Sequence, residues 1–513
     1  MKNLTKLLSL AMVLALLLVC AIQPAMAEIP VTAQEDTITV AMVSEAAQLD
    51  PEGDAVTQPD AIINVQCYEG LFKLNPETGE VMPCLATSYE WVEDNVMRVY
   101  LRDDVYFHDG SKFTAEDVLF NISRGVKSAS KEYSYGTVDY ENCKIVDDYT
   151  IDIATYGPYP ALLADMLDNG WVMISKNYFE STDYAEFIRN PMGTGPWVFK
   201  EWVAGDSISF TRNENYWGEK PYFGNLVIRT ITDDTTRALA LETGEVDYVI
   251  EVVSSQIEYI NEGEMATVQL IPGRTLEYVT MNEGFEPFQD VRVRQALMLA
   301  LDLPSMVNLA YGLGGSPADG VFFPGNVFYT APGTTYTQDI EKAKELMAEA
   351  GYADGFTCRL IAKDVSTRVT MCEMMKNAWA QLNVNAEISV MDIATYYNYI
   401  QNGDYEMGLG GFVCQVNDGD MYHDMFYSTS TYSSNYAQYK NEKFDELADA
   451  GRFELDNNVR QGYYDEIQEL LRSELPWLPI CFATETYGCR NTLTGAYLYD
   501  NGIPTFDKVV PAA

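Results

Sequence analysis

Residues 101–126 constrain the fold most, because this one stretch predicts a strand, a tight turn and a helix in succession. Its first residues alternate between apolar and polar as in a half-buried strand, and Asp109-Gly110 favours a turn in which glycine adopts positive φ at little cost. Thr114 followed by Asp117 resembles a capping box, so a helix should begin there. The apolar residues of this helix fall on one stripe, so the unit must pack against a larger body.

The length and composition of the chain are sufficient for such a body. A chain of 513 residues exceeds one ordinary hydrophobic core, so two or three compact units are expected. Hydrophobic residues make up 47% and charged residues 21%, which separates the chain from disordered sequences. Residues 60–70 predict a helix that ends at Gly70, and a short helix over residues 235–243 should end at Gly244. Short strands alternate with helices over residues 69–187, as in a self-contained inserted domain. Helices alternate with strands after residue 274, and two of these helices should begin at Asp290 and Asp339. The expected fold class is therefore α/β.

The N-terminus has the pattern of an export signal. Two lysines precede an apolar run over residues 7–19, and the small-x-small pattern at residues 25–27 fits cleavage by signal peptidase. We therefore expect a signal peptide over residues 1–27 and an exported mature chain. Lipidation at Cys20 is the alternative, although Val19 is large where such signals usually carry a small residue.

Acidic residues dominate the charge of the chain. There are 76 acidic and 33 basic residues, a formal net charge of −43, which argues against nucleic acid or anionic lipid as a partner. Only two histidines occur, and there is no GxSxG, HExxH or Walker motif, so we expect no enzyme, no metal and no cofactor. An exported hydrolase with paired carboxylates is the catalytic alternative.

Eight cysteines follow the predicted signal peptide, and none of them forms a CxxC pair, so their spacing supports neither a zinc site nor a thioredoxin-type motif. A chain of this size can fold without disulfides, so we expect free, packed cysteines. Bridges between the pairs closest in sequence, Cys358–Cys372 and Cys481–Cys489, are the alternative.

Eight motifs in a fixed order carry a resemblance to a known family. The segment FHDGSKFTAEDV, which contains the turn and capping box described above, resembles the signature of the family 5 extracytoplasmic solute-binding proteins. These are the receptors that feed peptide, nickel and related ABC importers. Seven further segments match in the expected order between Tyr68 and Tyr352: YEGLFKLNPETGE, PCLATSYE, NPMGTGPWVF, RNENYW, TGEVDY, PFQDVRVRQALMLALD and ELMAEAGY.

The resemblance implies a two-lobed α/β fold of the type II periplasmic-binding-protein kind, with a third inserted domain and a ligand cleft between the lobes. It implies a monomer that works with ABC permease subunits, in the periplasm or at the outer face of the cytoplasmic membrane. The ranges that we expect are a signal peptide (1–27), lobe I (28–68 and 188–273), the inserted domain (69–187), lobe II (274–480) and a return to lobe I (481–513).

The same resemblance indicates which residues face the cleft. They come from a loop of the first lobe, from the inserted domain, from a strand of the second lobe and from the loop over residues 411–420. The predicted ligand-binding residues are Glu45, Ala46, Tyr135, Tyr278, Phe412, Val413, Cys414, Gln415, Asn417 and Asp418. No catalytic or metal-binding residue is predicted.

Gln415 departs from the pattern of the peptide-binding members. Their segment reads Gly-Trp-x-x-Asp, with the tryptophan as a wall of the cleft and the aspartate holding the ammonium group of the peptide. Phe412 and Gln415 occupy those positions here. A neutral amide cannot form the charge-assisted bond, a difference of ~1–3 kcal/mol. Asp418, Asp420 or Glu45 could hold the ammonium group instead.

The expected ligand is a peptide or a peptide-like small solute, bound by hinged closure of the lobes. A non-peptide solute, such as a metal chelate, a sugar or an opine-like compound, is the alternative, because without a buried carboxylate the cleft would tolerate a solute that lacks an amine. His423, close in sequence to Asp418 and Asp420, is compatible with a metal chelate, although one histidine with carboxylates is also typical of a packing residue.

Overall fold

The computed structural model describes residues 37–512 apart from 54–55, 76–77, 129–130, 169, 334–335 and 432–433. The predicted signal peptide and the alternative lipidation site at Cys20 lie outside the described residues. Within them no single helix is long and apolar enough to cross a membrane, and one bent pair, Val291–Leu299 with Leu303–Gly314, meets that test only when taken together.

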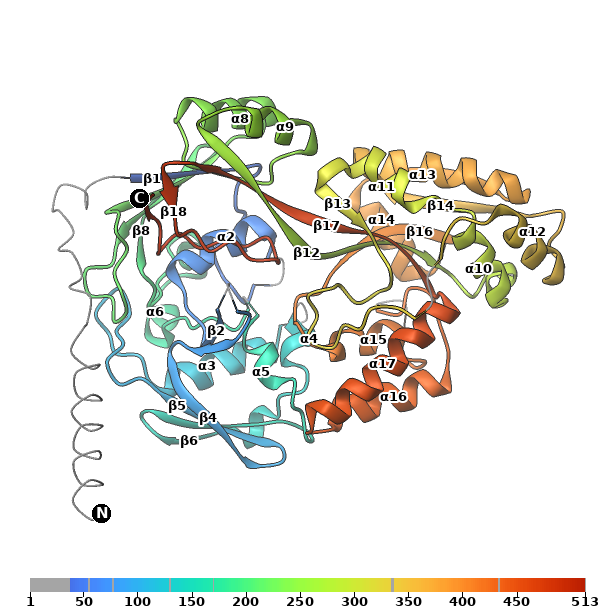
Figure 1. The fold of residues 1–513 in the computed structure, drawn as a ribbon. Helices are drawn as coiled ribbons and strands as arrows, with labels where there is room; N and C mark the ends of the chain where they lie inside the picture. The colour runs from blue at the N-terminus through green and yellow to red at the C-terminus, as the bar shows by residue number, and fades with distance from the viewer. Residues whose placement is uncertain are drawn as a thin grey trace, which may run out of the picture.

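One mixed sheet of eleven strands runs through both halves of the molecule (Figure 1). Its main path has the order β15-β14-β16-β12-β17-β11-β1-β10-β9-β8. The two longest strands, β12 (Ala266–Met281) and β17 (Trp477–Arg490), pair antiparallel and extend from the left half to the right half in Figure 1. These two strands therefore connect the lobes.

Lobe I holds one end of this sheet. Strand β1 (Thr37–Met42) lies parallel to β10 (Asn225–Thr230) and β11 (Tyr248–Ile250), and β9 (Ser207–Arg212) and β8 (Trp197–Val203) follow antiparallel. Three helices belong to this part: α2 (Gln58–Cys67), α8 (Asp234–Thr243) and α9 (Ser254–Glu262). Helix α2 ends at Cys67, three residues before the expected stop at Gly70, because Tyr68 already has extended backbone.

The inserted domain has its own four-stranded sheet. Its strands are β4 (Ala86–Glu93), β5 (Val96–Leu101), β7 (Thr150–Ala154) and β6 (Lys144–Asp147), in that order. A separate hairpin pairs β2 (Phe72–Leu74) with β3 (Val81–Pro83). The helices are α3 (Ala115–Gly125), α4 (Glu132–Tyr135), α5 (Leu162–Asp165), α6 (Lys176–Ser181) and α7 (Tyr184–Phe187).

The turn and the helix start predicted over residues 101–126 are confirmed, whereas the strand predicted at the start of this stretch is reduced to one isolated bridge between Tyr106 and Lys112. Gly110 has φ +86°, and the capping box between Thr114 and Asp117 opens α3. Val118 and Ile122 of this helix are completely buried in the core of the inserted domain. The stretch therefore fastens a helix to the four-stranded sheet.

Lobe II holds the other end of the large sheet, with β14 (Thr357–Lys363) between β15 (Asn385–Met391) and β16 (Met407–Val413). The two expected helix caps are present, because the side chains of Asp290 and Asp339 accept the first backbone N–H groups of their helices. The long helices of the lobe are α10 (Val291–Leu299), α11 (Leu303–Tyr311), α12 (Ile340–Glu349), α13 (Ser366–Trp379), α14 (Ile393–Asn402), α16 (Glu442–Phe453) and α17 (Asn457–Glu474).

The two connecting strands change register where the lobes meet. The pairing of β12 with β17 is interrupted between Pro272 and Leu276, and again between Glu277 and Tyr278. The expected lobe boundary at residue 274 falls within the first interruption, and the boundary at residue 480 falls within β17. The domain ranges themselves stay predictions.

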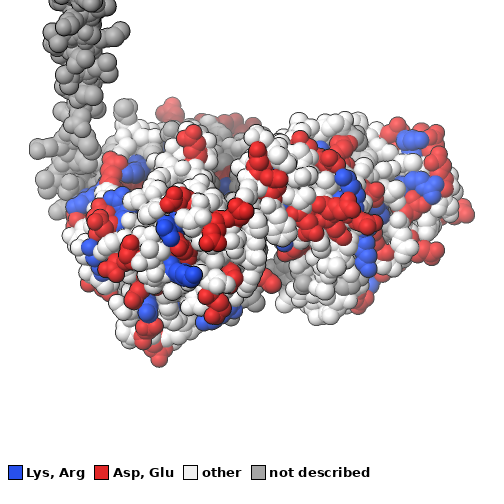
Figure 2. All heavy atoms as spheres, turned by 90° about the horizontal axis from the view of Figure 1, so that it is seen from below, with Lys and Arg blue, Asp and Glu red and all other residues white. Residues whose placement is uncertain are grey.

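All eight cysteines of the described chain are free. Seven are buried and Cys489 is half-buried. Seen from below in Figure 2, acidic side chains spread over both lobes, and an indentation separates the two bodies of the molecule.

Candidate ligand-binding site

A cavity of about 810 Å³ lies between the lobes. One wall comes from the inserted domain, including β2 and residues 160–168, and a second comes from the C-terminal segment over residues 497–508. Lobe II closes it with Val327, Phe328 and residues 415–418 and 455–461. This volume lies within the ~300–1,000 Å³ that is typical of small-molecule sites. The cleft between the lobes can therefore enclose a small solute.

Gln415 and Asn417 contribute to the lobe II wall in different ways. The Asn417 side chain bridges two backbone groups, accepting from the Val327 N–H at 3.1 Å and donating to the Gly325 carbonyl at 3.1 Å. Arg274 donates to the backbone carbonyl of Gln415 at 3.4 Å, and the Gln415 side chain, which has no hydrogen bond to any residue that the structure describes, is exposed at the cavity. Asn417 therefore fixes the loop, whereas the Gln415 amide is available to a ligand.

Asp418 also lines the cavity, but an arginine occupies its carboxylate. Arg460 donates to the two carboxylate oxygens at 2.6 and 2.9 Å, and both side chains are buried. Burial raises the pKa of Asp418 even though the positive charge of Arg460 lowers it. This bidentate pair ties the loop to α17, so Asp418 acts first as an anchor for the lobe II wall.

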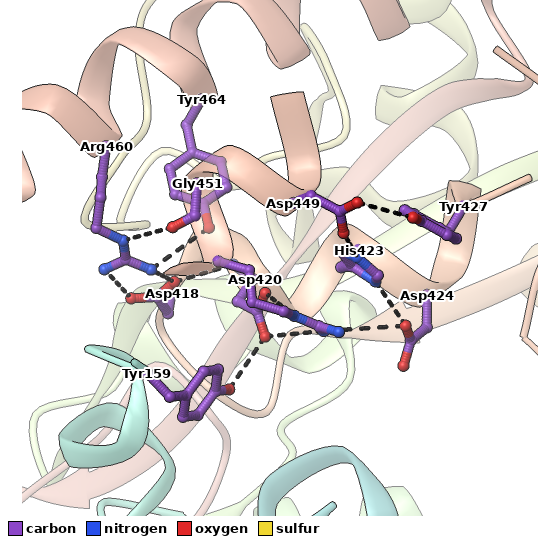
Figure 3. A network of polar contacts seen from close by, with 11 residues as sticks. Tyr159, Asp418, Asp420, His423, Asp424, Tyr427, Asp449, Gly451, Arg460 and Tyr464 are labelled. Carbon is purple, nitrogen blue, oxygen red and sulfur yellow. Dashed lines mark hydrogen bonds and ion pairs between the residues drawn. The ribbon is translucent and has the colours of Figure 1, made fainter. Parts of the chain in front are cut away.

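Asp420 links lobe II to the inserted domain. Arg452 donates to its two oxygens at 2.7 and 3.0 Å, and the Tyr159 hydroxyl of the inserted domain donates to the same carboxylate at 3.0 Å (Figure 3). Tyr159 is buried in this contact. We call Tyr159, Asp420 and Arg452 the interlobe contact; it holds the inserted domain against lobe II beside the cavity.

Asp165 of α5 lies against this contact as a buried acid. Its side chain is 1% exposed, and one of its oxygens, Oδ2, has no hydrogen-bond partner among the described residues. Burial raises the pKa of Asp165 well above its ordinary range, and the negative charges of Asp420 and Asp418 raise it further. The buried position and these two negative charges therefore favour the protonated form of Asp165.

His423 belongs to a polar cluster within lobe II. Its Nδ1 lies 2.7 Å from Asp424 and its Nε2 lies 3.3 Å from Asp449, while its ring stacks on Tyr427 (Figure 3). The described part of the chain holds no group of three or more His, Cys, Asp or Glu side chains that could bind a metal ion. His423, the first residue of α15 (His423–Phe426), thus packs against α16 and does not line the cavity.

The first-lobe and aromatic residues predicted to bind ligand lie away from this cavity. Glu45 accepts a hydrogen bond from the Trp202 indole at 2.7 Å, and Ala46 is buried in the core of lobe I. Tyr135 stacks on Trp171 with ring centroids 4.1 Å apart. All three lie outside the cavity wall as the lobes stand here, so their role in binding stays a prediction.

The predicted residues at the end of β16 and on its partner strand also pack within lobe II. Tyr278 stacks on Trp477 at 3.7 Å, and Phe412 contacts the same indole edge-on. Cys414 is completely buried, and Val413 is 39% exposed but outside the cavity wall. Of the ten predicted residues, the structure brings Gln415, Asn417 and Asp418 to the cavity.

The comparisons with known proteins agree with this architecture. The model of the bacterial extracellular solute-binding proteins, family 5, matches residues 80–434. The chain belongs to this family. A glutathione-binding protein, GsiB of Pectobacterium atrosepticum, is 28% identical over 507 residues, covering 96% of this chain and 97% of its own. The dipeptide-binding protein of Escherichia coli is 27% identical and covers 87% of this chain and 89% of its own.

A solved structure gives the fold of this solute-binding protein. The periplasmic binding protein DppA from Helicobacter pylori, in complex with the peptide STSA, superposes with a TM-score of 0.79 at 23% identity, covering 94% of this chain and 99% of the other. The predicted fold class, a two-lobed type II binding protein of α/β content, is confirmed.

Seven of the eight charged residues that line the cavity were not among the predicted site residues of this solute-binding protein, and Lys73 and Asp507 are two of them. Lys73 lies on β2 and Asp507 lies in the C-terminal segment, and both line the cavity. More than four hundred residues separate them, and neither stands in a motif that marks a ligand contact. The only sequence signal is that Lys73 lies within the matching segment YEGLFKLNPETGE.

Proposed function

We propose that this family 5 solute-binding protein is the extracytoplasmic receptor of an ABC importer. It encloses a peptide or a peptide-like small solute between its lobes and delivers that solute to permease subunits in the membrane. The observation that carries the proposal is the cavity of about 810 Å³ whose walls come from the inserted domain, the C-terminal segment and lobe II together. Such a site exists only when the lobes approach, which suits capture and release by hinged motion.

The ligand class follows from the relatives and from the wall of the cavity. The names of two relatives give glutathione and dipeptides as what those proteins bind, and a structural neighbour holds the peptide STSA. The cavity is lined by polar side chains such as Gln415 and by the rings of Tyr216, Tyr497 and Tyr499. Rings with hydroxyl groups and amides suit a short peptide, which offers both apolar surface and hydrogen-bonding groups.

We also propose a location and an oligomeric state for this receptor. We infer export through the signal peptide over residues 1–27, and a location in the periplasm or at the outer face of the cytoplasmic membrane. The receptor works as a monomer and without catalysis. The relatives are named for binding, which supports a receptor over an exported hydrolase.

A ligand screen with a chemical readout tests the proposal. The purified mature protein is incubated with free dipeptides, tripeptides and glutathione, and its thermal unfolding is recorded. We expect a concentration-dependent rise in Tm for a subset of these solutes, because a ligand that binds only the folded state stabilises it. Chromatography of the same mixtures should recover the solutes intact. No stabilisation by any peptide, or cleavage of the peptides, would contradict the proposed function.

A further inference from the structure

Eight charged side chains line the cavity, and six of them form ion pairs or hydrogen bonds with other residues of the protein. Among the cations, Arg274 pairs with Asp500 at 2.7 Å, Arg460 pairs with Asp418, and Lys508 pairs with Glu219 at 2.7 Å. Lys73 is different. Its ammonium group has no hydrogen bond and no ion pair to any residue that the structure describes, although the side chain is half-buried.

The acidic residues of the cavity divide in the same way. Glu69 is buried and accepts from the Tyr216 hydroxyl at 2.6 Å and the Trp217 indole at 3.0 Å. Asp168 accepts from the Gly170 backbone N–H and from the Tyr133 hydroxyl, and Asp418 holds Arg460. Within the described chain, the half-buried Asp507 has neither a hydrogen bond nor an ion pair.

The charged groups of Lys73 and Asp507 are close enough to interact electrostatically. Burial lowers the pKa of Lys73, but Cys84, Asp507 and Glu69 raise it, and the net effect lies above the ordinary value. Lys73 therefore stays an ammonium group at neutral pH. The two side chains come from the inserted domain and from the C-terminal segment, so the cavity offers one positive and one negative group that influence each other.

We propose that Lys73 and Asp507 form a subsite for a zwitterionic head group of the solute. The solute carboxylate lies against the Lys73 ammonium, and the solute ammonium lies against the Asp507 carboxylate. This inference rests on the proposed function, and it moves the recognition of ligand charge away from the lobe II loop. That loop presents the neutral Gln415, and its acids Asp418 and Asp420 already hold arginines.

The chemistry favours a ligand with both charges close together. Unpaired charged groups lose hydration when a cleft closes, and charge-assisted hydrogen bonds to a solute compensate for that loss. An α-amino-acid head group carries its ammonium and carboxylate on one carbon, so it can satisfy both side chains at once. A solute with only one of the two charges would leave the other side chain desolvated and unpaired, which opposes its binding.

Two variants with matched controls test the subsite by isothermal titration. Lys73→Met and Asp507→Asn each remove one charge. Lys176→Met removes a lysine outside the cavity that is already paired with Glu116, and Asp148→Asn removes an exposed acid of the β6–β7 turn. The probe is glutathione or the free dipeptide that stabilises the wild type most. Thermal unfolding of each variant without ligand verifies that it folds.

We expect Lys73→Met and Asp507→Asn each to weaken binding of that probe by about 10- to 100-fold, with changes below about 3-fold for the controls. Amidating the probe carboxylate should weaken wild-type binding to a similar extent and should add little to the loss in Lys73→Met. N-acetylation of the probe should likewise weaken wild-type binding and add little to the loss in Asp507→Asn.

If the wild type binds the probe but the variants and blocked probes bind equally well, the subsite is refuted and the receptor function stands. If the wild type binds no peptide or glutathione, the proposed function fails and the subsite with it.

Discussion

Two buried aspartates after β16, Asp418 and Asp420, each hold an arginine, and this pairing decides what they can contribute to binding. A carboxylate that already receives two guanidinium hydrogen bonds has little capacity left for a ligand ammonium group. Glu45, the third candidate, accepts from Trp202 instead. The three carboxylates that could replace the missing anchor at Gln415 therefore all have partners in the protein.

Asp418→Asn should lower stability rather than alter ligand choice. The substitution leaves the buried Arg460 guanidinium without its counter-ion, and removing one partner of a buried ion pair costs about 3–5 kcal/mol. Urea unfolding monitored by circular dichroism measures this loss. The control is Glu341→Gln, which breaks an exposed pair with Lys344 and should cost less than about 1 kcal/mol. A stable Asp418→Asn protein that has lost only its preference for free amines would contradict this role.

Tyr159→Phe should loosen the interlobe contact. The Tyr159 hydroxyl donates to Asp420 across the boundary between the inserted domain and lobe II, and hydrogen bonds to charged groups contribute about 1.5–3 kcal/mol. We expect a larger radius of gyration for the ligand-free variant in solution scattering. Tyr156→Phe alters a tyrosine of the same segment that is 74% exposed and should leave the radius unchanged. Equal radii for both variants and the wild type would exclude a role for the Tyr159 hydroxyl in holding the lobes.

Strands β12 and β17 are the elements on which lobe motion depends, because they alone of the long strands pair across both halves of the sheet. Their pairing is interrupted at residues 272–276, where Pro272 and Gly273 occur. Glu485 of β17 lies opposite Ile271 at this point. Burial raises its pKa to about 7, with further contributions from the negative charges of Glu251 and Asp500.

Glu485 should make stability depend on pH. The native state keeps its proton up to about pH 7, whereas the unfolded chain releases it near the ordinary value of ~4.3. The contribution of Glu485 to stability is therefore fully present below about pH 4 and is lost as pH rises from about 4.5 to 7. Glu485→Gln should raise stability by about 1–3 kcal/mol at pH 8 and leave it nearly unchanged at pH 4. Urea unfolding at both values measures this, with the exposed Glu258→Gln as control; an equal effect at both pH values would contradict the assignment.

Local sequence chemistry explains which elements could be predicted. The capping box at Thr114, the caps at Asp290 and Asp339 and the left-handed Gly244 act within a few residues, so their signals stand in the sequence itself. Helix α2 differed at its end because the backbone of Tyr68 turns extended where no glycine or proline marks a stop.

The candidate site was harder to predict because its parts meet only in three dimensions. Gln415, Asn417 and Asp418 lie together at the cavity because they share one loop, and their role in binding stays a prediction. The partners of Asp418 and Asp420 come from α17 and α16, and no sequence spacing shows that these arginines turn toward the loop. Lys73 lies early in the sequence and Asp507 lies near its end, so only the folded chain brings both residues to one cavity.

At the scale of the whole molecule, two bodies joined by long strands enclose the cavity and touch at a second point beside it. The buried Tyr159 hydroxyl, which donates to Asp420, joins the inserted domain to lobe II, and the buried Asp165 lies beside this contact. Burial and the negative charges of Asp420 and Asp418 raise the pKa of Asp165 at this point. The groups that face Asp165 are Tyr159 and Asp168 from its own domain, and Asp418 and Asp420 with their arginines from lobe II.

Small-angle X-ray scattering with and without ligand tests whether closure of the two lobes encloses the solute. The mature protein is measured at constant pH, alone and with a saturating amount of the peptide that stabilises it most. We predict a smaller radius of gyration and a smaller maximum dimension with ligand, because the inserted domain and lobe II approach across the cavity. Identical scattering profiles at saturation, with binding verified by calorimetry on the same samples, would contradict it.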